Sequence, residues 1–375
     1  MKCFAATLLL LISVPTALLA SAPVAAREVP APAAHVDADG PYIFRDGNAL
    51  QMQWICDDKV ESHALAADLG NAGIATRCGY PHTLHIAPPA TPAAAVLPAV
   101  PRIVVLSDIH GQYDLLVRLL RANKVIDQQD HWSLGTDTLV IAGDVFDRGP
   151  KVTEAFWLLY SLQQQAADAG GAVHFVLGNH ETMVLYEDLR YVNPKYLRSA
   201  QLLGRSYPQL YGTDSVIGQW LRTRPVLLRI GDTLFLHGGV SPEALELALD
   251  PARTNTAYQA SLGTPREQVK GNPTTAPLYD GKTSPIWYRG YFDGRLDTAG
   301  VQAVLDRLGL KRIVVGHTSM PHVSRFHGER IIAVDSSIKK GENGELLFIE
   351  EGRLSRGLLD GSRTALAEGT VGRDD

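Results

Sequence analysis

The stretch IAGDVFDRGP, residues 141–150, joins the end of an apolar run to two aspartates, an arginine and a Gly-Pro pair. Asp, Gly and Pro are turn formers, so the plainest interpretation is a turn after a buried strand. A turn alone does not explain why the carboxylates of Asp144 and Asp147 stand so close to the guanidinium of Arg148. The stretch therefore predicts a strand end and raises the question of what chemistry that strand end carries.

Four other β-branched runs end in the same way, in a cluster that contains Asp, Asn or His. They are RIVVLSDIHG (102–111), AVHFVLGNHE (172–181), DTLFLHGG (232–239) and RIVVGHT (312–318). Segments with a helical pattern separate the runs, among them DLLVRLLRAN (114–123) and TEAFWLLYSLQQQAAD (153–168). This alternation predicts an α/β fold whose strands are covered by helices. Ligands bind at the carboxyl ends of strands in such folds, so five clusters can converge on one site.

These strand ends supply a mixed set of carboxylate, amide and imidazole groups: Asp108, His110, Asp144, Asn179, His237 and His317. In an extended Asp-x-His segment both side chains point to one face, so the first two can share a cation. A single strand-end histidine is more often structural, but five coincidences outweigh that alternative. The set suits Zn, Mn or Fe rather than Ca or Mg. It exceeds the needs of one ion and suits two ions about 3.5–4 Å apart, an arrangement used in phosphoester hydrolysis.

The motifs SDIHG, GDVFDRG, GNHE, HGGVSP and VGHT, in this order, resemble the signature series of the calcineurin-like metallophosphoesterases over roughly residues 102–340. GDVFDRG with GNHE is similar to the phosphoprotein phosphatase branch, and the chain looks most like the bacterial Shewanella-like phosphatases. This resemblance implies a sandwich of two mixed β-sheets flanked by helices, with two metals at the strand ends. It assigns one metal to Asp108, His110 and Asp144 and the other to Asp144, Asn179, His237 and His317, with Asp144 as the bridge.

The same resemblance implies a hydroxide between the metals as the nucleophile, His180 as the general acid and Asp147 as the carboxylate that orients it. An oriented histidinium can supply a proton near neutral pH. A supporting role for His180 and a plain turn cap for Asp147 remain open. Arg148 is expected to clamp phosphate oxygens. Arg289 in PIWYRGYF is a second expected clamp, although a packed aromatic loop explains that segment as well.

Two departures from related patterns bear on the site. IIAVDSSI (331–338) stands where eukaryotic protein phosphatases carry Ser-Ala-Pro-Asn-Tyr, so a tyrosine contact to substrate is missing and Asp335 is expected to be structural. Ser319 stands where many metallophosphoesterases have the second histidine of Gly-His-x-His, so that extra ligand is absent. His322 and His327 are expected at the surface.

The leading functional expectation is hydrolysis of phosphomonoesters on protein serine or threonine, with tyrosine as a further option. Two divalent metal ions are the expected cofactors, manganese first and iron or zinc next. The first alternative is an exported small-molecule phosphohydrolase acting on nucleotides, dinucleoside polyphosphates or sugar phosphates. The second is a non-catalytic binding module, against which the complete set of expected ligands and catalytic groups argues.

Composition limits the expected partners and location. The 375 residues are 45% hydrophobic and 20% charged, with a net charge of -5 and no long basic run, so nucleic acid is not an expected partner. Met1-Lys2 and the apolar segment that follows predict a signal peptide over residues 1–26, cleaved after Ala26. The chain is thus expected to be periplasmic or secreted, with no stable membrane insertion once the signal is removed. An uncleaved anchor is the alternative.

The rest of the chain is expected to divide into a small β-rich unit (36–87), a Pro/Ala linker (88–101), the catalytic domain (102–358) and a flexible tail (359–375). In the small unit, PYIFR (41–45) and ALQMQWI (49–55) flank a hairpin turn, and TLHI (83–86) is expected to close the unit. Removal of the signal leaves two cysteines, which predicts a Cys56–Cys78 disulfide, with two buried thiols as the alternative. The 181–225 insert is expected to form helices that wall one side of the site. Together with the 241–286 loop, it is expected to decide whether a peptide or a small ester fits.

Overall fold

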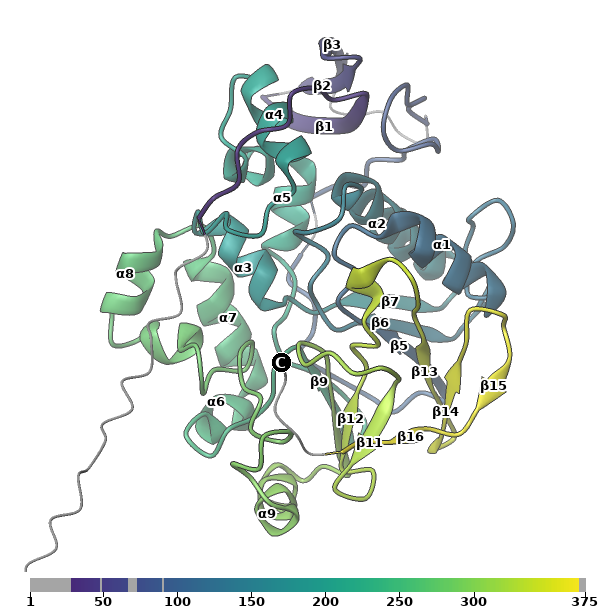
Figure 1. Ribbon diagram of the computed structural model, residues 1–375, viewed down its shortest axis with the longest axis vertical. Helices are drawn as coiled ribbons and strands as arrows, with labels where there is room; N and C mark the ends of the chain where they lie inside the picture. Colours follow the sequence, from purple (N-terminus) through teal and green to yellow (C-terminus); the bar gives the residue numbers. More distant parts are fainter. Residues whose placement is uncertain (1–27, 48, 67–72, 90, 371–375) are drawn as a thin grey trace, which may run out of the picture.

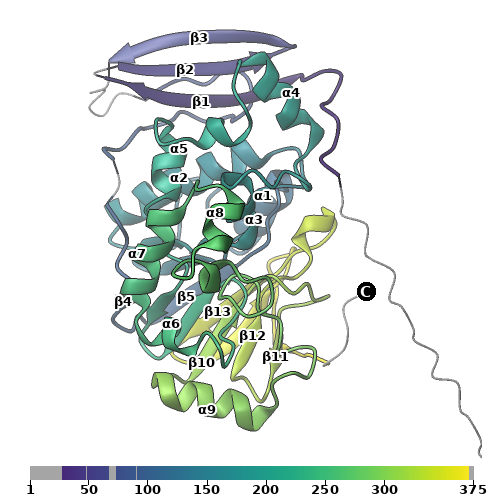
Figure 2. The same cartoon turned by 90° about the vertical axis from the view of Figure 1, so that its left-hand side faces the viewer.

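The computed structural model describes residues 28–47, 49–66, 73–89 and 91–370. The expected signal peptide and its cleavage after Ala26 lie outside these residues. Two large β-sheets pack face to face, helices cover their outer faces, and a small third sheet lies across the helices at one end (Figures 1 and 2). Within the described ranges, no helix combines the length and the apolar character needed to cross a membrane.

The first large sheet contains three of the predicted strands side by side. Its order is β15 (Arg363–Thr364), β14 (Arg353–Gly357), β13 (Leu346–Glu350), β5 (Arg102–Leu106), β6 (Thr138–Ile141) and β7 (Ala172–Phe175). β5, β6 and β7 are parallel, whereas β13 is antiparallel to β5. The sheet is therefore mixed, as expected.

The second large sheet contains the other two predicted strands. Its order is β16 (Ala367–Glu368), β11 (Ser324–Phe326), β12 (Ile331–Ala333), β10 (Arg312–Val315), β9 (Thr233–Leu236), β8 (Leu228–Ile230) and β4 (Val96–Leu97). β9 and β10 are parallel, and β8 is antiparallel to β9. The predicted sandwich of two mixed sheets is thus confirmed.

The helices lie on the outer faces of the sandwich and between the sandwich and the small sheet (Figure 2). They are α1 (Tyr113–Ala122), α2 (Val152–Asp168), α3 (Asn179–Leu185), α4 (Pro194–Leu202), α5 (Val216–Leu221), α6 (Leu245–Leu249), α7 (Pro251–Ser261), α8 (Arg266–Gly271) and α9 (Thr298–Leu308), with the short 3₁₀ turns η1 (Pro208–Tyr211), η2 (Ala276–Tyr279) and η3 (Ile338–Lys340). The 181–225 insert is helical, as expected, and contains most of α3 with α4, η1 and α5.

Both faces of the strands are buried because each sheet has the other sheet on one side and helices on the other. In β5, Ile103 and Val105 belong to the apolar layer between the sheets, whereas Val104 and Leu106 belong to the layer beneath the helices. Alternate side chains of a strand point to opposite faces, so a strand that is apolar at every position suits this place. Burial of each such side chain contributes about 1.5–3 kcal/mol.

The small N-terminal sheet is antiparallel and consists of β1 (Ala38–Asp46), β2 (Ala49–Cys56) and β3 (Lys59–Ala66). The expectation that TLHI (83–86) closes this unit is wrong, because Leu84 forms only an isolated bridge with Ile74. The third strand follows β2 directly, since Asp57 and Asp58 adopt positive φ angles of 52° and 59° and turn the chain straight back.

The disulfide between Cys56 and Cys78 is present, with their Cα atoms 5.6 Å apart, which confirms the predicted pairing.

The expected linker is more than a connection between two units, because β4 within it pairs with β8. The expectation of a flexible tail is wrong for residues 363–368, because β15 and β16 extend the two large sheets there. Edge strands offer unpaired backbone groups, and these short segments satisfy them.

Candidate functional site

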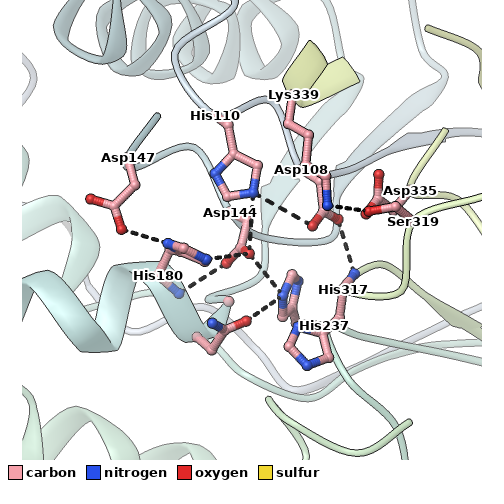
Figure 3. Close-up of polar contacts among 12 residues, drawn as sticks. Asp108, His110, Asp144, Asp147, His180, His237, His317, Ser319, Asp335 and Lys339 are labelled. Atoms are coloured by element: carbon pink, nitrogen blue, oxygen red, sulfur yellow. Dashed lines mark hydrogen bonds and ion pairs between the residues drawn. The ribbon is translucent and has the colours of Figure 1, made fainter. Parts of the chain in front are cut away.

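The polar clusters that end the predicted strands lie together at one edge of the sandwich (Figure 3). β5, β6 and β7 in one sheet and β9 and β10 in the other lead into this edge. Eight of the ten predicted site residues are buried in this cluster, each at most 5% exposed: Asp108, His110, Asp144, Asp147, Asn179, His180, His237 and His317. The edge therefore holds a buried polar cluster to which both sheets contribute.

The loops that carry these side chains are not extended. Asp108, His110, Asp144 and His317 have φ angles of 53°, 46°, 61° and 65°, in the left-handed region that non-glycine residues seldom adopt. The expectation that Asp108 and His110 share a face because they are extended is therefore wrong in its reason. The two side chains still meet, because the left-handed turns bring Oδ1 of Asp108 to 3.8 Å from Nε2 of His110. Such conformations persist where the surroundings enforce them, as at functional sites.

Two glycines let these loops approach one another. Gly143 has a φ angle of 90°, and a Cβ atom there would lie 2.8 Å from Nδ1 of His237. A Cβ atom at Gly178 would lie 2.1 Å from Oδ1 of Asp144. Any side chain at either position would push the strand ends apart, so both glycines are needed for the cluster to close.

Backbone carbonyls fix the orientation of two imidazole rings. Nδ1 of His110 lies 2.7 Å from the carbonyl oxygen of Phe146, and Nδ1 of His237 lies 2.7 Å from that of Ala142. A carbonyl can only accept, so both Nδ1 atoms donate and both Nε2 atoms face the cluster. This is the arrangement in which a histidine offers the Nε2 lone pair to a metal ion.

Asp144 lies at the centre of the cluster. Its Oδ2 atom is 3.6 Å from Nε2 of His110, 3.1 Å from Nε2 of His237 and 3.8 Å from Nε2 of His180. Donor atoms of His110, Asp144 and His180 lie within 4.8 Å of one another, and so do donor atoms of Asp144, His237 and His317. Because Asp144 belongs to both groups, its carboxylate is placed to bridge two cations.

The predicted ligand Asp108 lies on the side of the cluster nearest His110, and its Oδ2 accepts the backbone N–H of His317 at 3.0 Å. Burial, followed by the negative charge of Asp335, raises the pKa of Asp108 to about 8. The predicted ligand Asn179 also points inward, with Oδ1 2.9 Å from Nε2 of His237. All six predicted ligands are therefore brought together.

The donor set fits divalent metal ions. Nε2 of His317 is buried and has no hydrogen-bond partner in the described structure, which leaves a nitrogen available to a cation. Burial disfavours a charged His237, but the charges of Asp144 and Asp108 outweigh burial and raise its pKa to about 9. The carboxylates of the cluster thus favour positive charge at this place, and bound metal ions would supply it.

His180 and Asp147 form a close pair beside the cluster. Nδ1 of His180 lies 2.5 Å from Oδ2 of Asp147, whose side chain is fully enclosed. Burial lowers the pKa of His180, but the charge of Asp144 and the contact with Asp147 raise it above its ordinary value overall. The backbone N–H of His180 donates to Oδ1 of Asp144 at 3.0 Å, so the main chain of His180 is held next to Asp144.

The two predicted arginines lie at the rim. Arg148 is exposed, and its guanidinium carbon lies 5.2 Å from the centre of the Tyr191 ring, which is itself 5.3 Å from the His180 ring. Arg289 is half-buried and donates from Nη1 to the carbonyl oxygen of His317 at 2.7 Å. Tyr191 was not among the predicted residues, and no motif surrounds it in the sequence.

Residues 101–321 match the family model described as calcineurin-like phosphoesterase. The chain belongs to the calcineurin-like phosphoesterase family. Its members hydrolyse phosphoesters, so this chain is a metal-dependent phosphoester hydrolase, in agreement with the expected enzyme class.

Known proteins similar to this phosphoesterase include several phosphatases. The crystal structure of a cold-active protein-tyrosine phosphatase from a psychrophilic Shewanella species is 38% identical, with a TM-score of 0.84 over 88% of this chain and 100% of that one. Shewanella-like protein phosphatase 2 of Arabidopsis thaliana is 24% identical over 64% of this chain and 72% of that protein. Shewanella-like protein phosphatase 1 of Plasmodium berghei is 27% identical over 59% and 62%.

Glu181 is a positioning residue of this phosphoesterase and was not among the predicted site residues. Its buried carboxylate accepts the backbone N–H groups of Gly178 at 2.7 Å, Asp144 at 2.9 Å and Val145 at 2.8 Å. It therefore joins the strand end that carries Asp144 to the start of α3. A glutamate in the first turn of an expected helix is the signal that could have indicated a capping role.

A second unpredicted feature links Lys339, Ser319 and Asp335 (Figure 3). Nζ of Lys339 donates to Oγ of Ser319, and that hydroxyl donates to Oδ2 of Asp335 at 2.5 Å. Asp335 is fully buried and also accepts the backbone N–H of Ser337. The residue that replaces the second histidine of Gly-His-x-His in this phosphoesterase thus holds a lysine beside the cluster.

Proposed function

We propose that this phosphoesterase is a protein phosphatase that removes phosphate from tyrosine in polypeptides, with serine and threonine as further substrates. The named relatives support a polypeptide substrate, since all three are described as protein phosphatases. The sequence alone led us to expect phosphoserine and phosphothreonine as the main substrates. We now propose phosphotyrosine as the main substrate, because the 38% identical relative is described as a tyrosine phosphatase.

The observation that carries the proposal is the position of the Asp144 carboxylate between the imidazole of His110 and that of His237, with the His180–Asp147 pair beside it. Asp108, His110 and Asp144 would hold one divalent ion, and Asp144, Asn179, His237 and His317 the other. These ions would polarise the phosphate oxygens and lower the pKa of a water molecule, which supplies the nucleophile. Manganese is the first candidate ion, followed by iron and zinc.

The side chains of this chain would carry the remaining steps. Arg148 and Arg289 would bind the non-bridging phosphate oxygens and hold the ester in line for attack. Asp147 accepts the Nδ1 proton of His180, which leaves the Nε2 proton directed into the site. His180 would donate that proton to the leaving oxygen, so that tyrosine or serine departs as a neutral hydroxyl.

The location of this chemistry is also a proposal. The signal-like segment at residues 1–26 supports export, with the mature protein in the periplasm or outside the cell. The disulfide between Cys56 and Cys78 agrees with an oxidising compartment.

The test compares substrates on the mature protein loaded with Mn²⁺, Fe²⁺ or Zn²⁺. Peptides phosphorylated on tyrosine, serine or threonine within one sequence are ranked by kcat/KM against nucleotides, dinucleoside polyphosphates and sugar phosphates. We expect phosphotyrosine peptides to exceed the small molecules by more than about tenfold, equivalent to ~1.4 kcal/mol of transition-state binding. A nucleotide or sugar phosphate in first place would overturn the proposal in favour of a small-molecule enzyme.

Asp144→Asn tests the two-metal arrangement in the same assay. We expect this variant to lose turnover and to bind fewer than two metal ions, because an amide cannot bridge two cations as a carboxylate does. Asp168→Asn is the matched control, since Asp168 is exposed at the end of α2. Activity like that of the unmodified protein in Asp144→Asn would contradict the two-metal proposal. An unmodified protein that binds phosphopeptides but never turns them over with any metal would favour a binding module.

A further inference from the structure

Two depressions flank the turn η3, which carries Lys339 and Lys340. One has a volume of about 750 Å³, and its lining includes His317, Arg289 and both lysines. The other has a volume of about 480 Å³, and its lining includes Arg148, Tyr191 and the same two lysines. The two lysines therefore form a ridge shared by both depressions.

The first depression reaches the buried cluster, and the second lies beside the cluster on another side. His317, a predicted metal ligand, is part of the lining of the first depression. The second depression is lined by Arg148, which follows Asp147 in the sequence, and by Tyr191, whose ring lies 5.3 Å from the ring of His180. A phosphoryl group bound at the cluster would thus have open surface on two sides, and we call this continuous surface the basic groove.

The basic groove is positively charged although the whole chain carries a net charge of -5. Its cationic residues are Arg148, Arg190, Arg289, Lys339 and Lys340, whereas its acidic residues are Glu28 and Glu342. Arg190 is held by the carboxylate of Asp188 at 2.7 Å, which reduces its contribution. The remaining excess of cations concentrates positive potential at the site, and such focusing attracts anionic ligands.

Lys339 is held in place rather than free to move in solvent (Figure 3). Its ammonium donates to the neutral hydroxyl of Ser319, which is fixed by the buried Asp335. An ammonium has three donors, so two remain for a ligand. The charge is therefore already positioned, and less side-chain entropy is lost when an anion binds.

We propose that the basic groove binds an extended polypeptide with acidic residues on both sides of the phosphorylated residue. This inference rests on the proposed phosphatase function and names the class of its substrates. A polypeptide leaves a phosphorylated side chain in two directions, which matches open surface on two sides of the cluster. A sugar phosphate or mononucleotide leaves in one direction, and either depression alone lies within the ~300–1,000 Å³ range of small-molecule pockets.

The experiment uses three phosphopeptides that share a central phosphotyrosine and differ only in their flanks, which are acidic, neutral or basic. The ratio of kcat/KM for acidic over neutral flanks is measured for the full mature protein, for Lys339→Ala/Lys340→Ala and for Lys311→Ala. Lys311 is exposed and lines neither depression, so its variant controls for the loss of a surface charge.

We expect the unmodified protein to favour acidic flanks by roughly tenfold at low salt, with a smaller ratio at high salt because screening weakens such contacts. The ratio should fall close to one in the double variant and persist in Lys311→Ala. A ratio near one in the unmodified protein, or a full ratio in a folded double variant, would overturn the proposal. So would a higher kcat/KM for a dinucleoside polyphosphate, which also extends in two directions.

A binding measurement separates this inference from the proposed activity. A fluorescent acidic peptide without phosphate is titrated onto each protein, and its anisotropy is followed. Salt-sensitive binding that Lys339→Ala/Lys340→Ala weakens at least about fivefold supports the groove even if no phosphoester is turned over. Equal binding of acidic and basic peptides would reject it, and thermal melting of each variant shows whether lost binding reflects unfolding.

Discussion

The two aspartates of IAGDVFDRGP serve different partners. Asp144 accepts the backbone N–H of His180 with Oδ1 and turns Oδ2 toward the imidazoles of His110 and His237. Asp147 has a φ angle of 72°, which turns its carboxylate away from that centre and onto Nδ1 of His180. One short turn thus supplies a candidate bridge for metals and an anchor for a proton donor.

Asp147→Asn should therefore impair proton donation and leave metal binding intact. The amide keeps the shape of the carboxylate but removes the charge that favours a protonated His180. We expect kcat for phosphoserine peptides to fall by about 10²-fold, within the usual contribution of general acids. The loss should be much smaller for 4-nitrophenyl phosphate, whose leaving group needs little protonation. The measurement is kcat across aryl and alkyl phosphates together with metal content.

A supporting role for Asp147 gives a different result. If the carboxylate only stabilised the turn, kcat would fall by the same factor for every leaving group. Asp168→Asn again serves as the control, since Asp168 is exposed at the end of α2. Equal losses for alkyl and aryl esters would thus contradict the acid role of His180.

At the scale of elements, the strands and most of the site were predictable because both are local in the sequence. An apolar run followed by Asp, Asn or His marks a strand and its end without knowledge of the fold. The contacts of Glu181 were not predictable, because Asp144 and Val145, whose N–H groups it accepts, lie 37 and 36 residues earlier. The link from Lys339 to Ser319 spans 20 residues and connects η3 to the loop after β10, and these two segments carry no shared motif.

The left-handed backbone of the ligand loops was also beyond prediction. Asp108 and His110 read as the end of a strand, yet both adopt positive φ angles. Only the assembled cluster, with Asp108 held by the backbone of His317, enforces that conformation. The third strand of the small sheet was not predicted for a different reason. The turn at Asp57 and Asp58 that leads into this strand lacks the Gly or Asn that usually indicates a tight hairpin.

The disulfide should stabilise the small sheet more than the catalytic centre. It closes a separation of 22 residues between the end of β2 and the segment after β3. Loops of this size contribute about 3 kcal/mol when cross-linked. We expect Cys56→Ser/Cys78→Ser to lower the free energy of unfolding by about 2–4 kcal/mol, with kcat/KM unchanged at temperatures where the variant stays folded.

Urea unfolding followed by tryptophan fluorescence measures this effect, because Trp54 is buried in β2. The mature unmodified protein, which lacks Cys3, should behave like the double variant when reductant is present, and without reductant it should show no free thiol. Two titratable thiols in the native, unreduced protein would contradict the pairing.

At the scale of the whole molecule, the small sheet is fastened to the catalytic body by a buried polar network. Asp39 of β1 is fully buried and accepts hydrogen bonds from Thr153 of α2 and Ser199 of α4. Nζ of Lys195 lies 3.5 Å from Asp39 and donates to the carbonyl oxygen of Pro150, two residues after Arg148. The sheet therefore supports the loop that carries the proposed phosphate clamp, and we expect it to unfold together with the body.

This network makes stability depend on pH through Glu154. Burial raises the pKa of Glu154 from its ordinary 4.5 to about 7; the charge of Lys195 opposes this and the charge of Asp39 adds to it. At pH values between 4.5 and about 7, Glu154 keeps its proton in the folded protein but has released it in the unfolded chain. The free energy of unfolding must then fall as the pH rises through this window and level off above it.

Glu154→Gln removes this titration while it keeps the size of the side chain. We expect the variant to match the unmodified protein near pH 4.5 and to exceed it by about 1–3 kcal/mol at pH 8, since each pKa unit corresponds to about 1.4 kcal/mol. Urea unfolding at several pH values between these limits measures the difference, with the exposed Glu187→Gln as the control. Parallel curves for Glu154→Gln and the unmodified protein would show that Glu154 ionises in the folded state as it does in the unfolded chain, with Lys195 offsetting its burial in full.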